Sequence, residues 1–215
     1  MYKKKPFFIV FEGVEGCGKS FQSNKLLNNL KKKKIPSLLT REPGGTKSAE
    51  LIRNLILKDY FNKGNKEKFD KYTDTLLYLA ARNEHVKNKI KPSLKNKQVV
   101  ICDRFTDSTL AYQVYGKKVN INLINSVHKY ILNGLKPNIT FILKVSSKAS
   151  LKRLKMRRTK NRYDNFAQSF YTKAQKSFLR ISKGKKNYYV LESSNNDDSL
   201  EKKIFKIVSK HLKIK

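Results

Sequence analysis

The sequence predicts an α/β fold of three layers, in which a five-stranded parallel sheet is flanked by helices. Short apolar and β-branched segments recur along the 215 residues, amphipathic segments of helical period separate them, and a glycine-rich turn joins the first pair. Strands that alternate with helices become parallel neighbours, and the helices then cover both faces of the sheet. Because the chain has neither a repeat nor a long linker, we expect one domain over residues 1–215.

The elements follow in order from local composition. Residues 7–11 are apolar and aromatic, which is typical of a buried strand, and residues 21–34 place leucines at helical spacing until Pro36. Further strands are expected at residues 37–40, 99–102, 139–143 and 188–191. Further helices are expected at residues 49–57, 73–94 and 200–212, with a polar loop at 61–71. The buried side of the 73–94 helix is expected to carry Leu76, Leu77, Leu79 and Ala80.

The turn after the first strand has the spacing of a phosphate-binding loop. Its glycines, lysine and serine fit the pattern G-x-x-x-x-G-K-[ST] between a predicted strand and a predicted helix, which indicates a P-loop NTPase fold. Backbone N–H groups of such a loop converge on phosphate oxygens, and the helix N-terminus adds partial positive charge. Lys19 is expected to reach the β- and γ-phosphates of ATP, and the Ser20 hydroxyl to bind Mg²⁺. The expected nucleotide-binding residues are Gly13, Val14, Glu15, Gly16, Cys17, Gly18, Lys19 and Ser20.

Charged residues follow the other strands, at the sheet edge where ligands bind in such folds. Asp103 ends the third apolar strand, where a P-loop kinase places the acid that holds hydrated Mg²⁺. Arg41, Arg53 and Arg104 fall in segments after strands, where their guanidinium groups can bind a second phosphate bidentately. An acceptor that is already a phosphate needs such cations and no base, so the site is expected to take a nucleoside monophosphate.

The histidines support this interpretation by their positions. None lies beside the motifs as a catalytic base for a hydroxyl acceptor, and His85, His128 and His211 are all expected at the surfaces of helices.

Residue spacing also suggests how the nucleobase of the acceptor is bound: Tyr78 and Arg82 share one helix face. After Asp103, two adjoining stripes carry Ser108, Thr109, Tyr112 and Gln113. An aromatic ring, an arginine and hydroxyls suit a pyrimidine, although periodicity alone favours an ordinary helix edge between core and surface.

Composition limits the partners. The net charge is +33, but the lysines are spread along the whole chain on the polar sides of amphipathic segments, which favours a solvated surface over a specific nucleic-acid-binding face. The two cysteines form no C-x-x-C pair and no Cys/His cluster, so we expect reduced thiols in the cytoplasm and no structural metal site. Neither a signal peptide nor a membrane-spanning run is expected.

Five segments together carry a resemblance to a known family. FIVFEGVEGCGKS, TREPGGT, YLAARNEHV, VVICDRFTDSTLAYQVYG and NGLKPNITFIL resemble the bacterial thymidylate kinases, and the match runs over residues 7–212. The resemblance implies a homodimeric enzyme with a five-stranded parallel sheet that uses Mg²⁺-ATP to phosphorylate dTMP to dTDP.

The resemblance also implies roles for single residues. Glu15 is implied to accept a hydrogen bond from the deoxyribose 3′-hydroxyl, on the acceptor side of the loop, so that it does not repel the ATP phosphates. Tyr78 is implied to stack on thymine, Arg82 to bind the base carbonyl, and Arg104 to clamp the dTMP phosphate. The remaining implied contacts are Arg53 at the acceptor, Glu42 at the metal with Ser20 and Asp103 and near the acceptor phosphate, and Ser108, Thr109 and Gln113 at the base.

A catalytic arginine is implied in a lid, residues 153–165. Members of the family with glycine at the position of Gly16 take this arginine from the lid, and the order of preference here is Arg158, Arg157 and Arg153. Where the family often has two acids after the last lid arginine, this chain has only Asp164. Residues 192–196 are implied to pack on adenine.

Two other interpretations stay open at this stage. Another nucleoside monophosphate kinase or a deoxynucleoside kinase would share most of these motifs, although the latter would need a base where this chain has Asp103 and Arg104. A basic P-loop protein that binds nucleic acid is favoured by net charge alone.

Overall fold

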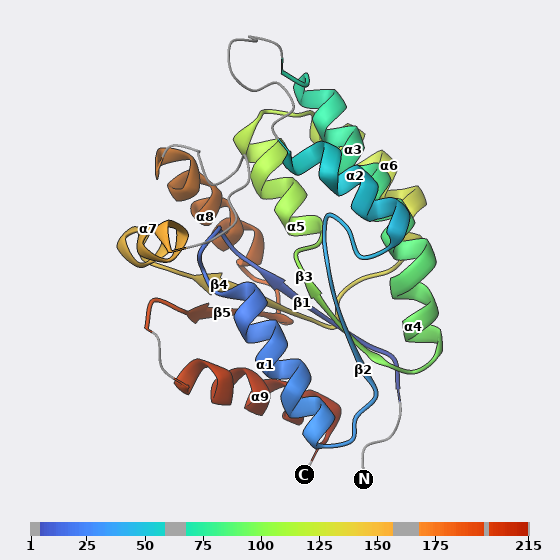
Figure 1. The fold of residues 1–215 in the computed structure, drawn as a ribbon, viewed down its shortest axis with the longest axis vertical. Coiled ribbons are helices and arrows are strands. Elements are labelled where there is room, and N and C mark those ends of the chain that lie inside the picture. Colours follow the sequence, from blue (N-terminus) through green and yellow to red (C-terminus); the bar gives the residue numbers. More distant parts are fainter. Residues whose placement is uncertain (1–4, 59–67, 157–167, 196–197, 215) are drawn as a thin grey trace.

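Strand β1, Phe7–Glu12, is the centre of the sheet around which the chain is arranged. In the computed structural model, which describes residues 5–58, 68–156, 168–195 and 198–214, five strands form one parallel sheet in the order β2-β3-β1-β4-β5 (Figure 1). The other strands are β2 Ser37–Arg41, β3 Val99–Asp103, β4 Ile139–Lys144 and β5 Tyr188–Glu192. All five strands agree with the sequence prediction to within a residue at each end.

Both faces of β1 are buried, which explains its unbroken apolar composition. Phe8 and Val10 pack into a cluster with Val100 and Phe105, and alternate residues of the strand pack into the larger cluster on the other face. Phe7, Ile9 and Phe11 belong to that larger cluster. A shift of one residue would exchange the side chains of the two faces, so both clusters would have to repack.

Helices cover both faces of the sheet. α1, Lys19–Lys32, and α9, Ser199–Leu212, pack against each other and lie together in Figure 1. α3, Lys71–His85, continues through a π-helical turn at Val86–Ile90 (η1) into α4, Lys91–Lys95, and packs against α6, Ile121–Leu132. The other helical segments are α2 Lys47–Leu57, α5 Thr106–Thr109 with a π-helical continuation Leu110–Gly116 (η2), α7 Ser147–Lys155 and α8 Gln168–Ser182.

The α3 helix corrects one sequence expectation. Leu79 is buried as expected and Leu77 is half-buried, but Leu76 is 49% exposed and Ala80 is also exposed. The buried side of α3 instead carries polar residues, Asp74, Thr75 and Arg82, beside Leu79 and Ala81. Helical periodicity marks an apolar stripe but not which neighbour covers it, and here the neighbouring α2 leaves part of the stripe uncovered.

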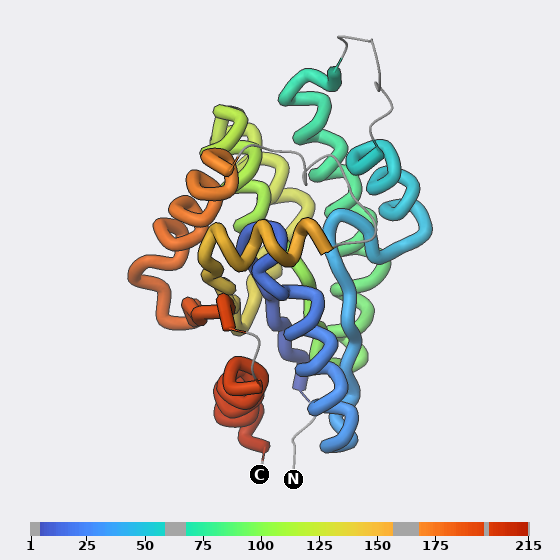
Figure 2. The backbone as a smooth tube through the Cα atoms, turned by 60° about the vertical axis from the view of Figure 1, so that its left-hand side comes forward, coloured from blue at the N-terminus to red at the C-terminus, as the bar shows by residue number. Residues whose placement is uncertain are grey.

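Parallel pairing brings the ends of three strands to one edge of the sheet. Phe11 and Arg41 both pair with Asp103, so the segments that follow β1, β2 and β3 start side by side. α7 reaches the same edge, since its Ser150 hydroxyl donates a hydrogen bond of 2.8 Å to the Glu15 carbonyl. Figure 2 shows α7 crossing beyond the N-terminal end of α1, away from α9. This edge therefore holds the motifs that the sequence analysis singled out.

Candidate active site

The glycine-rich turn between β1 and α1 is folded tightly against the sheet. Gly13 has a φ of 139°, and a Cβ atom there would lie 2.6 Å from the Leu143 carbonyl oxygen of β4, so glycine is required. Gly18 caps α1 in the left-handed conformation. The first N–H groups of α1 have no partners within the helix and are available to an anion.

Lys19 and Ser20 stand at the start of α1. The Lys19 ammonium donates hydrogen bonds to the carbonyl oxygens of Gly13, at 3.0 Å, and Val14, at 2.8 Å, and thereby braces the loop. The Ser20 hydroxyl donates a hydrogen bond to the Asp103 carboxylate at the end of β3. The two oxygens that the sequence analysis assigned to Mg²⁺ therefore lie side by side, and their role as metal ligands stays a prediction.

This pair of oxygens suits Mg²⁺. The ion prefers oxygen ligands in octahedral geometry, and in kinases it takes only one or two from the protein. Among the described residues no group of three or more His, Cys, Asp and Glu side chains could hold a metal ion. A single carboxylate with a hydroxyl therefore fits an ion whose other ligands are phosphate oxygens and water.

A pocket of about 450 Å³ opens beside the loop, between α1, α3 and the α5 region. All the residues predicted for the acceptor side line it: Glu15, Arg41, Glu42, Arg53, Tyr78, Arg82, Arg104, Ser108, Thr109, Tyr112 and Gln113. Of the loop and metal residues, Gly16, Gly18, Lys19, Ser20 and Asp103 also line it, whereas Gly13, Val14 and Cys17 do not. The walls further include Phe21, Pro43, Leu57, Phe105 and Leu154, which the sequence analysis did not single out.

Glu15 is turned toward the pocket and away from the loop's own N–H groups. Its carboxylate accepts a hydrogen bond of 2.8 Å from the Arg104 guanidinium and one of 2.6 Å from the Tyr112 hydroxyl. Burial disfavours the charge of Arg104, but nearby Tyr112, Glu15 and Asp103 outweigh burial and raise its pKa well above the ordinary arginine value. Arg104 is therefore a fixed cation at the bottom of the pocket.

Two more arginines face the pocket from the second strand and α2. Arg41 donates two hydrogen bonds to the carboxylate of Glu50, at 3.2 and 3.1 Å. Arg53 donates one of 2.6 Å to the Pro43 carbonyl oxygen. Burial and the charge of Arg41 lower the pKa of Arg53, which means that the two guanidinium groups lie close enough to repel. The Glu50 carboxylate partly offsets this repulsion, because its Oε2 lies 3.1 Å from Arg41 Nη2 and 3.9 Å from Arg53 Nε.

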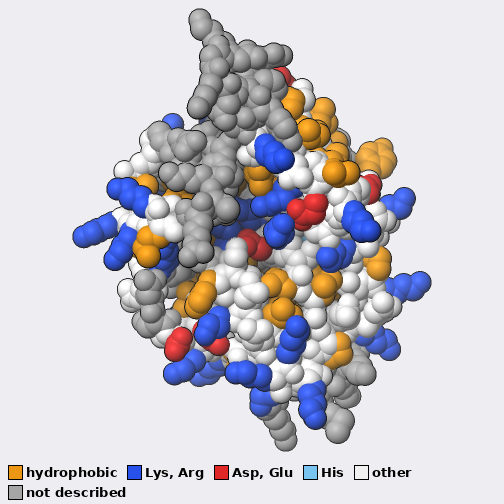
Figure 3. All heavy atoms as spheres, in the orientation of Figure 1, with side chains coloured by type: hydrophobic (Ala, Val, Ile, Leu, Met, Phe, Trp, Pro, Cys, Tyr) orange, Lys and Arg blue, Asp and Glu red, His pale blue; other side chains and the backbone are white. Residues whose placement is uncertain are grey.

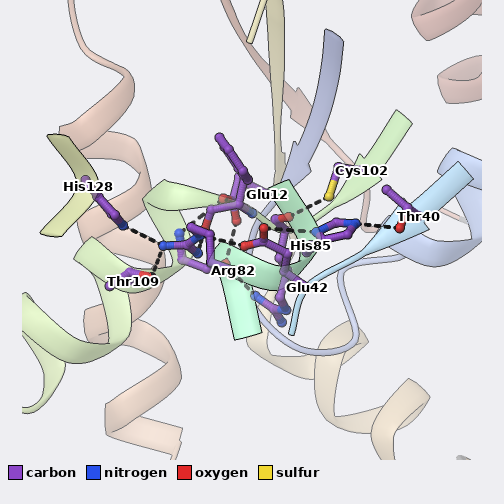
Figure 4. Close-up of polar contacts among 11 residues, drawn as sticks. Glu12, Thr40, Glu42, Arg82, His85, Cys102, Thr109 and His128 are labelled. Carbon is purple, nitrogen blue, oxygen red and sulfur yellow. Dashed lines mark hydrogen bonds and ion pairs between the residues drawn. The ribbon is translucent and has the colours of Figure 1, made fainter. Parts of the chain in front are cut away.

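Arg82 is held through all three of its guanidinium nitrogens (Figure 4). Nε donates to Glu42 at 2.7 Å and Nη2 to the Phe105 carbonyl at 2.9 Å. Nη1 donates to the Thr109 hydroxyl at 2.9 Å and to His128 Nε2 at 2.7 Å. A guanidinium has five N–H donors, so these contacts use four and leave one on Nη2 for a ligand.

Comparisons with known proteins agree with this geometry. The family model described as thymidylate kinase matches residues 11–204. The chain belongs to the thymidylate kinase family. Relatives named thymidylate kinase include one from Wolbachia sp. subsp. Brugia malayi (strain TRS), 42% identical over 81% of this chain and 80% of its own length. Another, from Aster yellows witches'-broom phytoplasma (strain AYWB), is 39% identical over 96% of both chains.

A solved structure shares the fold as well. The crystal structure of thymidylate kinase from Ehrlichia chaffeensis superposes with a TM-score of 0.72 at 32% sequence identity, covering 95% of this chain and 99% of that one. Membership of this kinase family makes the chain an enzyme of phosphoryl transfer, with the P-loop NTPase fold that the sequence predicted.

The histidines correct the sequence analysis, which placed all three at the surface. His85 is completely buried, with Nδ1 3.1 Å from the Glu42 carboxylate and Nε2 2.7 Å from the Thr40 hydroxyl. Because a carboxylate only accepts, Nδ1 of His85 carries the proton. The ring also explains Gly45 of the TREPGGT segment, which has a φ of 95° and where a Cβ atom would lie 2.5 Å from the ring.

His128, on α6, was also expected at the helix surface, but it contacts the buried Arg82. Burial and the charge of Arg82 lower the pKa of His128 to about 3, so the ring is neutral at ordinary pH and its Nε2 accepts the Arg82 hydrogen bond. His211 is half-buried and bonded to the Tyr189 hydroxyl, 2.7 Å away. No spacing rule connects His128 to Arg82, because the contact joins two helices 46 residues apart in sequence.

Gln113 has a buried side-chain amide that faces the pocket. It is only 2% exposed and lines the pocket, and among the described residues its amide Nε2 has no hydrogen-bond partner. A buried amide without a partner is costly, so a ligand that accepts from it would be favoured.

The predicted lid is described only in part. Arg157 and Arg158 lie outside the described residues, as does Asp164. Arg153 is described, and its guanidinium donates to the carbonyl oxygens of Gly16, at 3.1 Å, and Ser193, at 2.8 Å. It therefore ties the P-loop to the segment after β5 that was expected to pack on adenine.

The Glu42 network gives a prediction for stability against pH. Burial opposes the Glu42 charge, but Arg82 and His85 outweigh it and lower the pKa of Glu42 below the ordinary carboxyl value. Its ionised form therefore stabilises the fold above the unfolded-state pKa, and this contribution is lost as the pH falls through the lower folded-state pKa. Glu42→Gln should reduce the free energy of unfolding by about 3–5 kcal/mol at pH 7, because it leaves Arg82 buried without its carboxylate.

Urea unfolding of wild type and Glu42→Gln from pH 7 down to acid pH measures this difference, which should shrink as the pH falls. Glu201→Gln, which breaks a partly exposed ion pair with Lys25, is the control and should cost much less than Glu42→Gln. A Glu42→Gln deficit that stays constant down to acid pH would contradict the assignment of an ionised Glu42.

Proposed function

We propose that the chain transfers the γ-phosphoryl group of Mg²⁺-ATP to dTMP, giving dTDP and ADP. The observation that carries this proposal is the position of the arginine-lined pocket, which shares Lys19 and Ser20 with the phosphate-binding loop. Two phosphate sites that meet at one lysine can hold donor and acceptor next to each other. Such positioning, with electrostatic stabilisation, is most of what phosphoryl transfer requires.

The donor is assigned to the loop of residues 13–20. The N–H groups of the loop and of the start of α1 would bind the α- and β-phosphates, and Lys19 would turn from its loop carbonyls to the β- and γ-phosphates. Mg²⁺, held by Ser20 and Asp103, would neutralise charge on the donor phosphates. Both carboxylate oxygens of Glu42 bind Arg82 and His85, so we assign Glu42 to support of Arg82 and the acceptor site and not to the metal's own ligand set.

The acceptor phosphate is assigned to Arg104, Arg53 and Arg41. All three guanidinium groups line one pocket, and guanidinium groups bind phosphate oxygens bidentately. Glu50 offsets only part of the charge of Arg41 and Arg53, because one carboxylate lies near two cations. The dTMP phosphate is an anion at neutral pH, and its oxygen attacks without a base to remove a proton. The arginines would hold two anionic groups together against their repulsion.

The thymine ring is assigned to the far wall of the pocket. Tyr78 would stack on the ring, and the remaining Nη2 proton of Arg82 would bind a carbonyl oxygen. Thr109 already accepts a hydrogen bond from Arg82, whereas Gln113 has an amide without a partner among the described residues, so we assign Gln113 to the base edge. Ser108 completes this wall.

Glu15 is assigned to the sugar of the acceptor. Its carboxylate is bonded to Arg104 and Tyr112 on the pocket side, where it can also accept from a 3′-hydroxyl. In that place it orients Arg104 and does not lie against the ATP phosphates. The acid in the phosphate-binding loop therefore serves the acceptor.

A homodimer is also proposed, through the apolar face of α2 and α3. Leu51 is 70% exposed, Leu55 43% and Leu76 49%, and the two helices pack side by side. Figure 3 shows hydrophobic side chains gathered over these helices. A contiguous apolar patch of this kind marks a protein interface more often than bare surface.

We further propose that the enzyme works in the cytoplasm, without a specific nucleic-acid partner. Both cysteines are free and buried, and no helix in the described part of the chain is long and apolar enough to cross a membrane. On the face in Figure 3, the lysine and arginine side chains that are coloured are scattered and form no single stripe.

The proposed function is tested by ADP release with a panel of nucleoside monophosphates and deoxynucleosides, with and without duplex DNA. Turnover that prefers dTMP and is indifferent to DNA is expected at about 0.15 M salt, where exposed charges are screened. If the enzyme prefers another monophosphate or a deoxynucleoside, that compound and not dTMP is the acceptor, and the proposal is wrong on this point. Tight, sequence-selective DNA binding at this salt would overturn the interpretation of the lysines.

Glu15→Gln tests the acceptor-side role of the acid. It should lower kcat/KM for dTMP about ten- to a hundredfold, since one charge-assisted hydrogen bond is worth roughly 1.5–3 kcal/mol. The affinity for ATP should be spared, because the carboxylate faces Arg104 and Tyr112 and not the donor. Steady-state kinetics with each substrate varied in turn gives both values. Unchanged constants for dTMP, or a loss confined to ATP, would refute the assignment.

Arg158→Ala tests the lid arginine, which lies outside the described residues. We expect kcat to fall by about 10³–10⁵ with small changes in substrate dissociation constants, as for an arginine that acts on the transferring phosphoryl group. Arg157→Ala and the double variant cover the second candidate, and Lys160→Ala is the control for lost charge. If even the double variant loses less than tenfold in kcat, the catalytic arginine lies elsewhere.

Leu51→Glu tests the proposed dimer. A charge in the middle of the apolar face should raise the dimer dissociation constant by at least tenfold, because an unpaired charge would be buried at the interface. Sedimentation equilibrium measures this change, and Lys206→Glu on α9 controls for the altered net charge. A wild type that sediments as a monomer, or a Leu51→Glu dimer as tight as the wild type, would rule out this face.

A further inference from the structure

Glu12, at the end of β1, is a buried acid that neither the phosphate-binding loop nor the metal site uses. It is 0% exposed and sits between the strand and the start of α5. One carboxylate oxygen, Oε1, accepts hydrogen bonds from the backbone N–H groups of Phe105, at 2.8 Å, and Ser108, at 3.1 Å. The other, Oε2, lies 2.6 Å from the Ser108 hydroxyl oxygen. Glu12 thus holds the segment that carries one wall of the acceptor pocket.

The Ser108 hydroxyl can donate only one hydrogen bond and accept two. It has one proton and two lone pairs, and the Arg104 guanidinium already donates to it at 3.1 Å. If Glu12 is ionised, Oε2 can only accept, so the single Ser108 proton is directed to Glu12. If Glu12 is neutral, its proton must be on Oε2, because two N–H groups already donate to Oε1. Glu12 then donates to Ser108, and the Ser108 proton is free to point into the pocket.

We propose that Glu12 is a positioning residue that, as a neutral acid, turns Ser108 into a hydrogen-bond donor toward an oxygen of the acceptor nucleotide. The inference rests on the proposed function for the nature of that nucleotide. The geometry around Glu12 itself does not depend on it.

The electrostatics of the site agree with a neutral acid. Burial and the nearby charge of Asp107 raise the pKa of Glu12 to about 8, although Ser108, Arg104 and the Phe105 N–H group act in the other direction. Cys102 and Tyr188 are the other titratable groups that interact with it, and both have raised pKa values, so neither ionises near neutral pH. The pKa of Asp107 is raised as well, chiefly by burial, but the Tyr188 hydroxyl and the charge of Lys185 favour the ionised form of Asp107. The proton is therefore kept on Glu12.

The consequence is a pH dependence of acceptor binding with a defined sign. Below the pKa of Glu12 the acid is neutral and Ser108 donates to the ligand. Above it, the ionised Glu12 accepts the hydrogen bond of the Ser108 hydroxyl, so Ser108 no longer donates to the ligand, and a negative charge lies behind the pocket. Affinity for dTMP should therefore fall as the pH rises through about 8, by about three- to tenfold for one hydrogen bond. Affinity for an ATP analogue should not follow this change, because the described hydrogen bonds of the Glu12 carboxylate go to Phe105 and Ser108 and not to the loop assigned to the donor.

Glu12→Gln separates this inference from a merely structural role. The amide keeps the oxygen that accepts from Phe105 and Ser108, and its NH₂ group donates to the Ser108 hydroxyl as the neutral acid would, but it cannot ionise. Calorimetry of dTMP binding between pH 6.5 and 9 should show the fall in affinity in wild type and its absence in Glu12→Gln. An identical pH dependence in both proteins would overturn the inference.

Infrared spectroscopy of the same proteins gives a second readout that needs no nucleotide. The C=O band of a protonated carboxylic acid should be present at pH 7 in wild type and in Asp107→Asn, and missing in Glu12→Gln. Its absence from wild type, or its loss in Asp107→Asn alone, would place the proton elsewhere and refute the proposal. If wild type shows the band but binds no dTMP, the proposed function fails while the protonation of Glu12 stands.

Discussion

A guanidinium that leaves water must be paired, and this constraint organises the acceptor pocket. Arg104 is paired with Glu15, and Arg82 with Glu42. Each carboxylate is held in turn by a further side chain, Tyr112 for Glu15 and His85 for Glu42. These pairs cost more free energy in desolvation than an apolar filling of the same volume would, so their presence is better explained by binding than by stability.

The same pairing separates the two anions that the enzyme must bring together. Glu15 lies within the phosphate-binding loop in sequence, but its ion pair with Arg104 turns its charge toward the pocket that we propose for the acceptor. In the proposed assignment, the loop N–H groups and Lys19 bind the donor phosphates without an opposing carboxylate. One edge of a parallel sheet can in this way hold two phosphates of like charge, because each meets its own set of cations and Lys19 borders both.

Sequence reasoning reached the fold and most of the pocket, because both depend on local patterns. Strand composition, the spacing of the glycine loop and charged residues at strand ends located Asp103 and Arg104 beside Ser20. It failed where a contact joins distant segments: His85 and His128 were expected at the surface, and Leu76 and Ala80 in the core. An acid inside the apolar strand FFIVFE was a visible signal for Glu12, since an acid is rarely buried without partners. No comparable signal marked His128.

The central claim is that Glu15 and Arg104 belong to the acceptor and that Ser20 and Asp103 belong to the donor. A crystal structure with Mg²⁺, ADP and dTMP bound tests it most directly. The account predicts Mg²⁺ between Ser20 and Asp103, the dTMP phosphate on Arg104, and the Glu15 carboxylate against the deoxyribose, with the Arg82–Glu42 pair unmoved. A structure in which Glu15 contacts the ADP phosphates, or in which dTMP binds outside the arginine-lined pocket, would contradict it.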